Sequence, residues 1–292
     1  MTEQSLPEAQ VNAIVSRALT EDTCHGDITS DLLLPVGLYG EAAVGIKAAG
    51  VLAGGEIAAA VFRQVDPDLA VSLLVPDGTP VQPGDTVMTV SGKVSGILTG
   101  ERTALNFLQR LSGIASLTAR YVAAVAGTTA RIYDTRKTTP GLRLLEKYAV
   151  RAGGGTNHRR DLGDGILIKD NHLAAAEHLG MGLAEAVRKA KQGAPSGVKV
   201  EVEVTTPEAA ADALAAGADI IMLDNMTTAE MRRAVAMVGG KAKIEASGGI
   251  TLDNVRAVAL TGVDIISVGA LTHSYRSLDI SLELEPDTLK LL

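Results

Sequence analysis

The 292-residue chain has few aromatic residues and almost no cysteine. It contains no Trp, two Phe and five Tyr, so its core has to be built from aliphatic side chains. The single cysteine, Cys24, excludes an intramolecular disulfide and favours a reducing, cytoplasmic location. With 31 glycines and 46% hydrophobic residues, the composition favours a packed α/β protein over a sandwich with aromatic corners.

Several functional segments are also absent from the sequence. The start, MTEQSLPEAQ, has neither the basic region nor the apolar stretch of a signal peptide. No apolar run approaches the roughly 18 residues that a transmembrane helix needs, so we expect no membrane partner. The formal net charge of −7, without a basic tail, argues against nucleic acid. The five histidines form no HExxH motif and no cysteines pair, so we expect no zinc site.

Positive charge is concentrated in one part of this acidic chain. Residues 131–173 contain nine basic and five acidic residues, whereas the remainder contains 18 basic and 29 acidic ones. A positive island of this kind is typical of a site for a small anionic ligand. An ordinary solvated helix face around residues 143–151 would explain part of it.

From about residue 130, short apolar segments that end in polar residues alternate with helical patterns. The apolar segments are RIYDTRK, GILIKDN, VKVEVEV, DIIMLDN, AKIEASGG and DIISVGA. This repeat predicts a parallel sheet, and in a barrel the polar strand ends would converge on one mouth. Six such segments are fewer than the eight strands of a complete barrel. We therefore predict an incomplete α/β barrel of six or seven parallel strands over residues 113–274.

Residues 1–112 show a different pattern. The segment VPDGTPVQPGDTVMTVSGKVSGIL alternates with period two around DG and PGD turns, which predicts hairpins in a smaller α/β domain. A helical pattern from about Glu101 to Ala126 is expected to join this domain to the barrel. The tail, residues 275–292, is expected to pack back on the first domain.

The segment GGGTNHRR, residues 153–160, is a candidate anion-binding loop. It matches neither the P-loop spacing nor GxGxxG, but glycines let a backbone approach a ligand closely. Arg159 or Arg160 could bind a carboxylate through two parallel hydrogen bonds, and His158 can donate or accept. The alternative is a glycine-rich surface turn with solvated arginines.

Cations also follow two of the expected strands. Arg136 and Lys137 are adjacent in DTRKTTPG and repel each other unless an anion lies close by or one of them points outward. Lys169 in GILIKDNH could bind phosphate or act as a Schiff-base nucleophile. Alternatively, Lys169 is a structural lysine whose stem packs on apolar surface.

Carboxylates and small residues follow the other strands. Alternation in VEVEV puts Glu201 and Glu203 on one face, and Asp224 ends the next strand. Glu203 and Asp224 could hold Mg²⁺ through water, bind sugar hydroxyls, or pair with Lys169 and Lys137. Backbone N–H groups at the ends of the last two strands are expected to bind phosphate. These are Ser247, Gly248 and Gly249, and Val268, Gly269 and Ala270.

Together with GERTALN before them and SVGALTHS after them, these motifs resemble the quinolinate phosphoribosyltransferase family. The resemblance runs from about EDTCHGDIT to the C-terminus. It implies transfer of phosphoribosyl from phosphoribosyl pyrophosphate to quinolinate with loss of CO₂, giving nicotinate mononucleotide for de novo NAD biosynthesis. It also implies Mg²⁺, an N-terminal open α/β sandwich domain, and a homodimer in which this domain covers the partner's barrel mouth.

The resemblance also implies roles for individual residues. The quinolinate carboxylates would be surrounded by Arg102 from the partner chain, Arg136, Lys137, His158, Arg159 and Lys169. Phosphoribosyl pyrophosphate would contact Lys137 and Lys169, while Glu203 and Asp224 would hold its ribose hydroxyls and Mg²⁺. The 5′-phosphate would lie at residues 247–249 and 268–270. Neither a covalent enzyme intermediate nor an organic cofactor is implied.

Three other functions remain open from the residues alone. A relative with the same fold could take a different pyridine or base. Lys169 could form a Schiff base in an aldolase-type reaction, although the surrounding arginines argue against this. A non-catalytic protein that binds an anionic metabolite could share the sequence, and only turnover separates it from an enzyme.

Overall fold

The computed structural model describes residues 6–292, so the first five residues of the segment in which we expect no signal peptide lie outside it. The chain forms two compact units. Unit 1 contains the described residues up to Ala119 together with Thr138–Gly154 and Ser274–Leu292. Unit 2 contains Arg120–Lys137 and Gly155–His273. The boundary expected between residues 112 and 113 falls inside a long helix, α4 (Val94–Ala124), and the domain limits stay a prediction.

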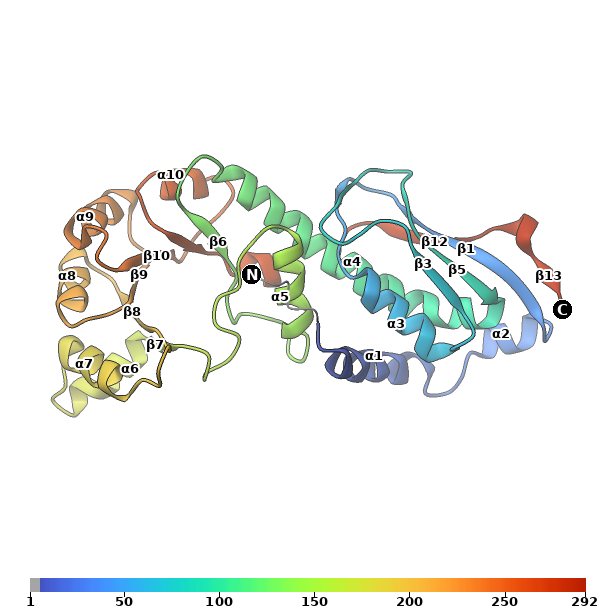
Figure 1. Cartoon of the computed structure of the whole chain (residues 1–292), viewed down its shortest axis with the longest axis horizontal. Coiled ribbons are helices and arrows are strands. Elements are labelled where there is room, and N and C mark those ends of the chain that lie inside the picture. Colours follow the sequence, from blue (N-terminus) through green and yellow to red (C-terminus); the bar gives the residue numbers. More distant parts are fainter. Residues whose placement is uncertain (1–5) are drawn as a thin grey trace. The chain divides into compact units, whose positions relative to one another are not determined.

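Unit 2 is built on six parallel strands in the order β6-β11-β10-β9-β8-β7 (Figure 1). β6 and β7 are the two edges of this sheet, so the barrel is incomplete and the predicted fold class is confirmed. The strands are β6 (Arg131–Tyr133), β7 (Ile166–Ile168), β8 (Val200–Val204), β9 (Ile220–Asp224), β10 (Lys243–Ser247) and β11 (Ile265–Ser267).

Helices cover the outer side of these strands, and Figure 1 shows α7, α8 and α9 along β8, β9 and β10. The local sequence explains several helix starts. The Thr206 hydroxyl accepts the Ala209 N–H, and Pro207 occupies the first turn of α8. Thr227 and Glu230 form a reciprocal capping box at the start of α9. The helices are α6 (Asp170–His178), α7 (Leu183–Gly193), α8 (Pro207–Ala215), α9 (Thr228–Val238), α10 (Val255–Ala259) and α11 (Ala270–His273).

The strands of unit 2 have an aliphatic outer face and a partly polar inner face. Val202, Ile221 and Ala246 are fully buried on the outer face. The alternate residues of the same strands, including Glu201 and Glu245, point into the barrel. The barrel interior therefore contains carboxylates, which need partners because an isolated buried charge is unfavourable.

A non-strand segment extends the sheet beyond β6. The Thr156 N–H donates to Ile132 O at 2.8 Å, and the Asp134 N–H donates to Thr156 O at 3.1 Å. Thr156 thereby forms an isolated parallel bridge with Tyr133. We call residues 156–160 the closing segment, because they lie at the open edge of the six-stranded sheet.

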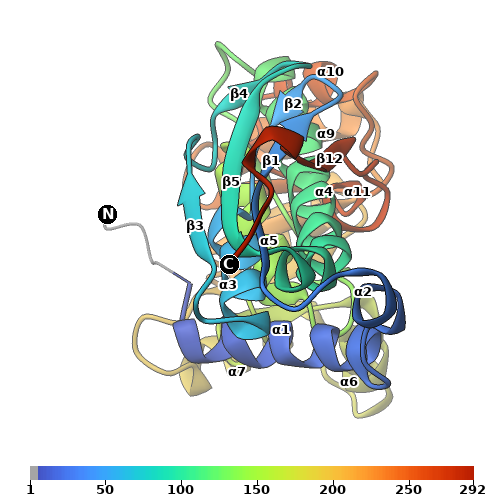
Figure 2. The same ribbon diagram turned by 90° about the vertical axis from the view of Figure 1, so that its right-hand side faces the viewer.

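Unit 1 contains an antiparallel sheet of order β12-β1-β5-β3, with β13 also pairing with β1 (Figure 2). Two of these strands come from the C-terminal tail, and Ala42 of β1 is paired with Leu284 of β12. The strands are β1 (Leu38–Ile46), β3 (Ala70–Leu73), β5 (Thr86–Lys93), β12 (Ile280–Leu284) and β13 (Lys290–Leu291). A separate pair, β2 (Gly50–Val51) and β4 (Pro80–Val81), and the short helix η1 (Pro286–Thr288) complete the strands and turns of this unit.

The helices of unit 1 are α1 (Glu8–Thr23), α2 (Ile28–Leu33), α3 (Gly55–Val65), most of α4, and α5 (Arg143–Ala152). Helix α4 begins at Val94, earlier than the expected start near Glu101. Val94 and Ile97 are both buried, so the spacing of three that marks a helix is already present there. A Cβ atom on Gly100 would lie 2.9 Å from the Phe62 ring, so this glycine permits close packing of α4 on α3.

Candidate active site

The interior of unit 2 encloses a cavity of about 220 Å³. Ile166, Ile220 and Ile265 are the first residues of β7, β9 and β11, so this end of the cavity lies at the amino ends of the strands. The opposite end is lined by His158 and Arg159 of the closing segment. The cavity therefore extends from the amino ends of these strands to the closing segment, which Asp134 holds at the end of β6.

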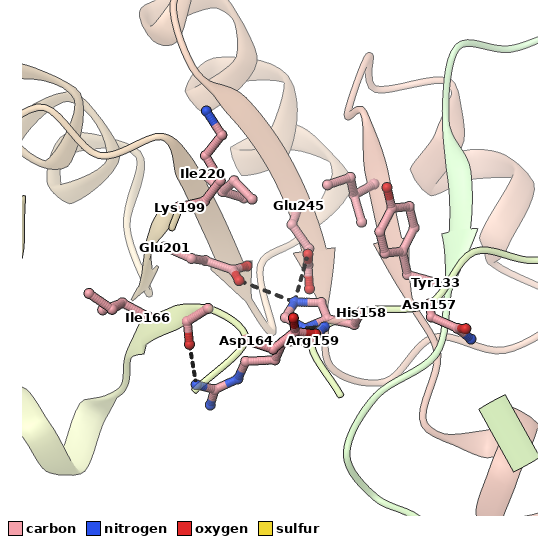
Figure 3. Close-up of a pocket in the computed structure, with 12 residues that line it drawn as sticks. Tyr133, Asn157, His158, Arg159, Asp164, Ile166, Lys199, Glu201, Ile220 and Glu245 are labelled. Carbon is pink, nitrogen blue, oxygen red and sulfur yellow. Dashed lines mark hydrogen bonds and ion pairs between the residues drawn. The ribbon is translucent and has the colours of Figure 1, made fainter. Parts of the chain in front are cut away.

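The His158 ring is held between two buried carboxylates from different strands (Figure 3). Its Nε2 lies 3.1 Å from Glu201 Oε2 of β8 and 3.5 Å from Glu245 Oε2 of β10. The second ring nitrogen, Nδ1, accepts the backbone N–H of Arg159 at 2.8 Å. Both ring nitrogens of His158 are therefore engaged by the protein itself.

The protonation state of this cluster follows from competing contacts. Burial lowers the pKa of His158, but hydrogen bonds to Glu201 and Glu245 and the charges of both carboxylates raise it to about 10. A second ring proton would have to occupy Nδ1, where Arg159 already donates its N–H. A pKa of about 10 would make the ring cationic at neutral pH, whereas the hydrogen bond from Arg159 requires an unprotonated Nδ1. We follow the hydrogen bond and assign the neutral Nε2–H tautomer in this structure. Burial raises the pKa of Glu201 to about 7. The hydrogen bond and charge of His158 act to lower this pKa, whereas the Glu245 charge acts to raise it.

Asp134, the residue after β6, anchors the backbone of the closing segment. Its side chain is fully buried. Oδ1 accepts the His158 N–H at 2.8 Å, and Oδ2 accepts the Asn157 side-chain amide at 2.6 Å. The sequence places Asp134 at the strand end, but nothing in the sequence pairs it with residues 157 and 158.

Two half-buried guanidinium groups influence each other in this region. Burial and the charge of Arg136 lower the pKa of Arg159. Arg159 Nη1 donates to Gly165 O at 2.8 Å, which holds its side chain at the rim of the cavity. Arg160, in contrast, is exposed and pairs with Asp164, Nε to Oδ2 at 3.3 Å. Two half-buried like charges close enough to affect each other are typical of an anion-binding site.

The predicted residues at the ends of β7, β8 and β9 lie at one edge of the sheet. Lys169 Nζ is 3.2 Å from Glu203 Oε2. Asp224, at the end of β9, accepts the Asn225 side-chain amide at 2.9 Å. Glu203 and Asp224 end neighbouring hydrogen-bonded strands, so their carboxylates lie at the same edge. Lys169 and Glu203 thus form one of the ion pairs that the sequence allowed, which is compatible with a role of Glu203 toward Mg²⁺ or a sugar.

The last two strands end in the small residues expected at a phosphate site. A Cβ on Gly269 would lie 3.2 Å from Lys137 Cδ, so the Lys137 stem lies beside this loop. The Thr272 hydroxyl donates to Lys137 O at 2.8 Å and fixes the backbone there. After β10, Gly248 has φ +90° and packs on the Asn225 side chain, an arrangement that favours glycine. The structure thereby brings residues 247–249 next to Asn225 and residues 268–270 next to Lys137.

The glycines of GGGTNHRR have a packing role that differs from the expected one. A Cβ on Gly153 would lie 2.3 Å from Ala115 O of α4, so this glycine permits contact with a helix rather than with a ligand. Gly154 has φ +83°, a conformation that favours glycine, at the turn after α5. The expectation of ligand-facing glycines is therefore wrong for Gly153, because the neighbouring helix occupies the space.

Unit 1 contains a buried ion pair that the sequence did not predict. Arg110 of α4 donates to the Glu146 carboxylate and to the Thr139 hydroxyl, and its guanidinium lies 5.1 Å from the centre of the Tyr275 ring. The same Glu146 accepts the Thr139 N–H at 3.1 Å. These contacts fix the residues that follow Arg136 and Lys137. Arg102, also on α4, is exposed.

Two sets of side chains could hold a cation. Among residues 6–292, the ligand atoms of His158, Glu201 and Glu245 form the one set of three that lie within 4.8 Å of one another. Glu203 and Asp224 offer a second, oxygen-only set. Mg²⁺ prefers oxygen ligands and usually binds through one or two carboxylates with water and substrate phosphates, so the second set fits it better.

None of the helices within residues 6–292 has the length and hydropathy needed to cross a bilayer.

Comparison with known sequences gives two family matches. The C-terminal domain of quinolinate phosphoribosyl transferase matches residues 114–283, and the N-terminal domain matches residues 27–112. Together these matches cover most of the chain.

Curated relatives and solved structures agree with these matches. The chain is 43% identical to a probable nicotinate-nucleotide pyrophosphorylase [carboxylating] of Bacillus subtilis, covering 94% of this chain and 93% of the relative. It is 42% identical to the human nicotinate-nucleotide pyrophosphorylase [carboxylating], covering 96% and 93%. The structure of the Francisella tularensis nicotinate-nucleotide pyrophosphorylase matches with a TM-score of 0.91 at 40% identity, covering 98% and 100%. The resemblance seen in the sequence is confirmed, and the chain belongs to the quinolinate phosphoribosyltransferase family.

Proposed function

We propose that this protein transfers the phosphoribosyl group of phosphoribosyl pyrophosphate to quinolinate, forming nicotinate mononucleotide, pyrophosphate and CO₂ for NAD biosynthesis. Family membership across both domains supports the reaction. The structural observation that carries the proposal is the pair of half-buried guanidinium groups, Arg136 and Arg159, which suits a substrate with two carboxylates. A cytoplasmic location is part of the proposal, and the single cysteine supports it.

Quinolinate would lie at the carboxyl ends of β6 and β7, beside the closing segment. Arg136 and Arg159 would each bind a carboxylate oxygen pair, because a planar guanidinium matches that geometry. Lys137 and Lys169 follow the same two strands and would balance the remaining negative charge. The resemblance also assigns His158 to quinolinate, a role that the contacts of its ring refine below.

Phosphoribosyl pyrophosphate would occupy the remaining strand ends. Glu203 and Asp224 would accept hydrogen bonds from the ribose hydroxyls, and residues 247–249 and 268–270 would donate backbone N–H groups to the 5′-phosphate. Glu203 and Asp224 would also hold Mg²⁺ through water. When bound, Mg²⁺ would neutralise charge on the pyrophosphate leaving group.

The chemistry needs positioned charge and no covalent intermediate on the protein. The quinolinate ring nitrogen bonds to C1 of the ribose while the C1–O bond breaks and pyrophosphate leaves with its electron pair. The carboxylates of Glu203 and Asp224 stabilise the cationic character that develops at C1. The bond from ring C2 to its carboxylate then breaks, CO₂ leaves, and the electron pair stays on C2. The positive ring nitrogen stabilises that pair until a proton adds.

One assay tests the reaction and the choice of pyridine. The purified protein is mixed with phosphoribosyl pyrophosphate, Mg²⁺ and either quinolinate or nicotinate, while CO₂ and nicotinate mononucleotide are measured. We expect product and CO₂ in equal amounts with quinolinate. Product formed with nicotinate alone would overturn the substrate, and the absence of turnover with both would favour a binding protein.

A homodimer with a shared active site is also part of the proposal. The resemblance places Arg102 of one chain at the barrel mouth of the partner, and an exposed Arg102 on α4 is compatible with this role. The test mixes two inactive variants, Arg102→Ala and Lys169→Ala, under conditions that exchange subunits. We expect partial recovery of activity, because some mixed dimers contain one intact site. An unchanged lack of activity after demonstrated exchange would exclude the shared site.

A further inference from the structure

The His158 ring has no nitrogen left for a substrate, because Nε2 faces the two carboxylates and Nδ1 accepts the Arg159 N–H. We propose that Glu201, Glu245 and His158 form a positioning chain, which sets the backbone of Arg159 and so aims its guanidinium at quinolinate. In this chain Arg159 touches the substrate, and His158 and the two glutamates act through it. The inference rests on the proposed function, in which Arg159 binds quinolinate.

The location of Glu245 is difficult to explain by stability alone. It lies between Ile244 and Ala246 in the middle of β10, and its side chain is fully buried. Both of its carboxylate oxygens, and Oε1 of Glu201, lack a hydrogen-bond donor among the described residues, and Glu245 Oε2 lies 3.5 Å from His158 Nε2. Replacing a whole buried ion pair with apolar residues of similar volume is often neutral or stabilising, so burial of such groups is weak evidence for a role in stability. A buried carboxylate kept in the barrel therefore points to a task beyond packing.

We infer that this task is to fix the closing segment, which has few contacts with the strands. Thr156 is bridged to Tyr133, but the closing segment then leaves the sheet. Asp134, the residue after β6, accepts the His158 N–H, while the ring Nε2 lies 3.1 Å from Glu201 of β8 and 3.5 Å from Glu245 of β10. His158 is thus placed by Asp134 and by residues of two strands, and the ring in turn accepts the next N–H in the chain, that of Arg159.

The Arg159 side chain starts from this fixed backbone. Its Nη1 donates to Gly165 O just before β7, so the side chain spans from the closing segment to the edge strand. A small rotation at the Arg159 backbone would move the guanidinium by several times the shift at Cα, because the side chain is long. Substrate geometry is sensitive to misplacements of about 1 Å. The positioning chain should therefore control quinolinate binding more than binding of the other substrate.

The charged groups around the ring are consistent with a positioning role. Glu201, Glu245 and Asp134 face His158 or its backbone, while the charge of Arg136 acts on the neighbouring Arg159, which lines the cavity. The ring therefore contacts both glutamates through Nε2 and the Arg159 backbone through Nδ1.

The first variant is Glu245→Leu, which removes the carboxylate at similar volume. We expect the KM for quinolinate to rise about fivefold or more, and the KM for phosphoribosyl pyrophosphate to change less than twofold. Glu245→Gln keeps one acceptor oxygen and should give a smaller rise in the quinolinate KM. It also serves where Glu245→Leu fails to fold. Glu208→Gln, an exposed glutamate on α8, is the matched control and should leave both KM values unchanged.

A double-mutant cycle identifies the route of the effect. In an Arg159→Ala background, Glu245→Gln should no longer change the quinolinate KM, because the group that it positions is gone. A second comparison uses His158→Gln, whose amide can still donate toward the glutamates and carries no charge. His158→Gln should keep more quinolinate affinity than His158→Ala. If His158 instead bound quinolinate through its own charge, the two variants would lose the same affinity.

The possible failures are distinguishable. If Arg159→Ala leaves the quinolinate KM unchanged, the proposed substrate contact is wrong and the inference falls with it. If Arg159→Ala raises that KM but Glu245→Leu and Glu245→Gln do not, the positioning chain alone is overturned. Equal losses from Glu245→Gln in the wild-type and Arg159→Ala backgrounds would also overturn it, since the effect would not pass through Arg159.

Discussion

The backbone N–H of His158 donates to Asp134 Oδ1 at 2.8 Å, which ties the closing segment to the end of β6. Asp134→Ala would leave this N–H and the Asn157 amide without their buried acceptor. We expect the free energy of unfolding to fall by about 2–4 kcal/mol, since each orphaned donor costs roughly 1–3 kcal/mol. Urea denaturation measures this loss. Asp134→Asn keeps one acceptor and should lose less, and an equal loss in both variants would contradict the assignment.

The cations at the strand ends give a prediction about activity. Arg136→Ala, Arg159→Ala and Lys169→Ala should each lower kcat/KM by about 100-fold or more, because a charge-assisted contact in the transition state is worth roughly 2–4 kcal/mol. Steady-state kinetics with both substrates measures the change. Arg160→Ala is the control, since Arg160 is exposed and pairs with Asp164. Wild-type-like kinetics in all three site variants would exclude the proposed site.

The packing of Gly153 against α4 gives a prediction about stability. Gly153→Ala would place a Cβ 2.3 Å from Ala115 O, so either the helix or the loop has to move. We expect a loss of about 1–3 kcal/mol, the usual range for overpacking. Gly193→Ala is the matched control, because no atom lies within 4 Å of its Cβ position and α7 ends there. Thermal denaturation of both variants should show a lower Tm for Gly153→Ala alone.

The pKa of Glu201 gives a pH-dependent prediction. It is raised from 4.5 to about 7 in the folded protein, so the folded state binds more protons than the unfolded state between these values. The folded state is stabilised by holding this proton. That contribution to the free energy of unfolding is fully present below pH 4.5 and is lost as the pH rises through 7. Glu201→Gln mimics the protonated form, so its stability relative to wild type should increase from pH 4.5 to 7, by at most about 1.4 kcal/mol per pH unit. Urea denaturation at several pH values checks this, and a constant difference would contradict it.

Much of the fold is predictable because its signals are local. Apolar runs with polar ends predicted all six strands of the barrel, and the capping residues Thr206 and Thr227 mark the starts of α8 and α9. The start of α4 was placed too late, because VSGKVSGIL also alternates with period two. Buried Val94 and Ile97 show that tertiary packing decides between the two patterns there.

The contacts within the site are less accessible from sequence, because alternation assigns a face but no partner. VEVEV placed Glu201 and Glu203 on one side of β8, yet only the structure shows that Glu201 meets His158 and Glu203 meets Lys169. Glu245 was missed altogether. A signal for it existed, since a glutamate between Ile244 and Ala246 in an apolar strand has to find a partner inside the barrel.

The two glutamates of β8 have a consequence for how sequence change can act on this protein. Glu201 and Glu203 are two positions apart, so one strand supplies both the deep contact to His158 and the contact at the mouth to Lys169. A one-residue slip of β8 would turn both carboxylates toward the helices and three valines into the barrel. A one-residue insertion or deletion between Glu201 and Glu203 would put the two carboxylates on opposite faces and should remove at least one contact, whereas a change of length in the loop after Val204 would spare both. The register of β8 therefore decides whether Glu201 reaches His158 and Glu203 reaches Lys169.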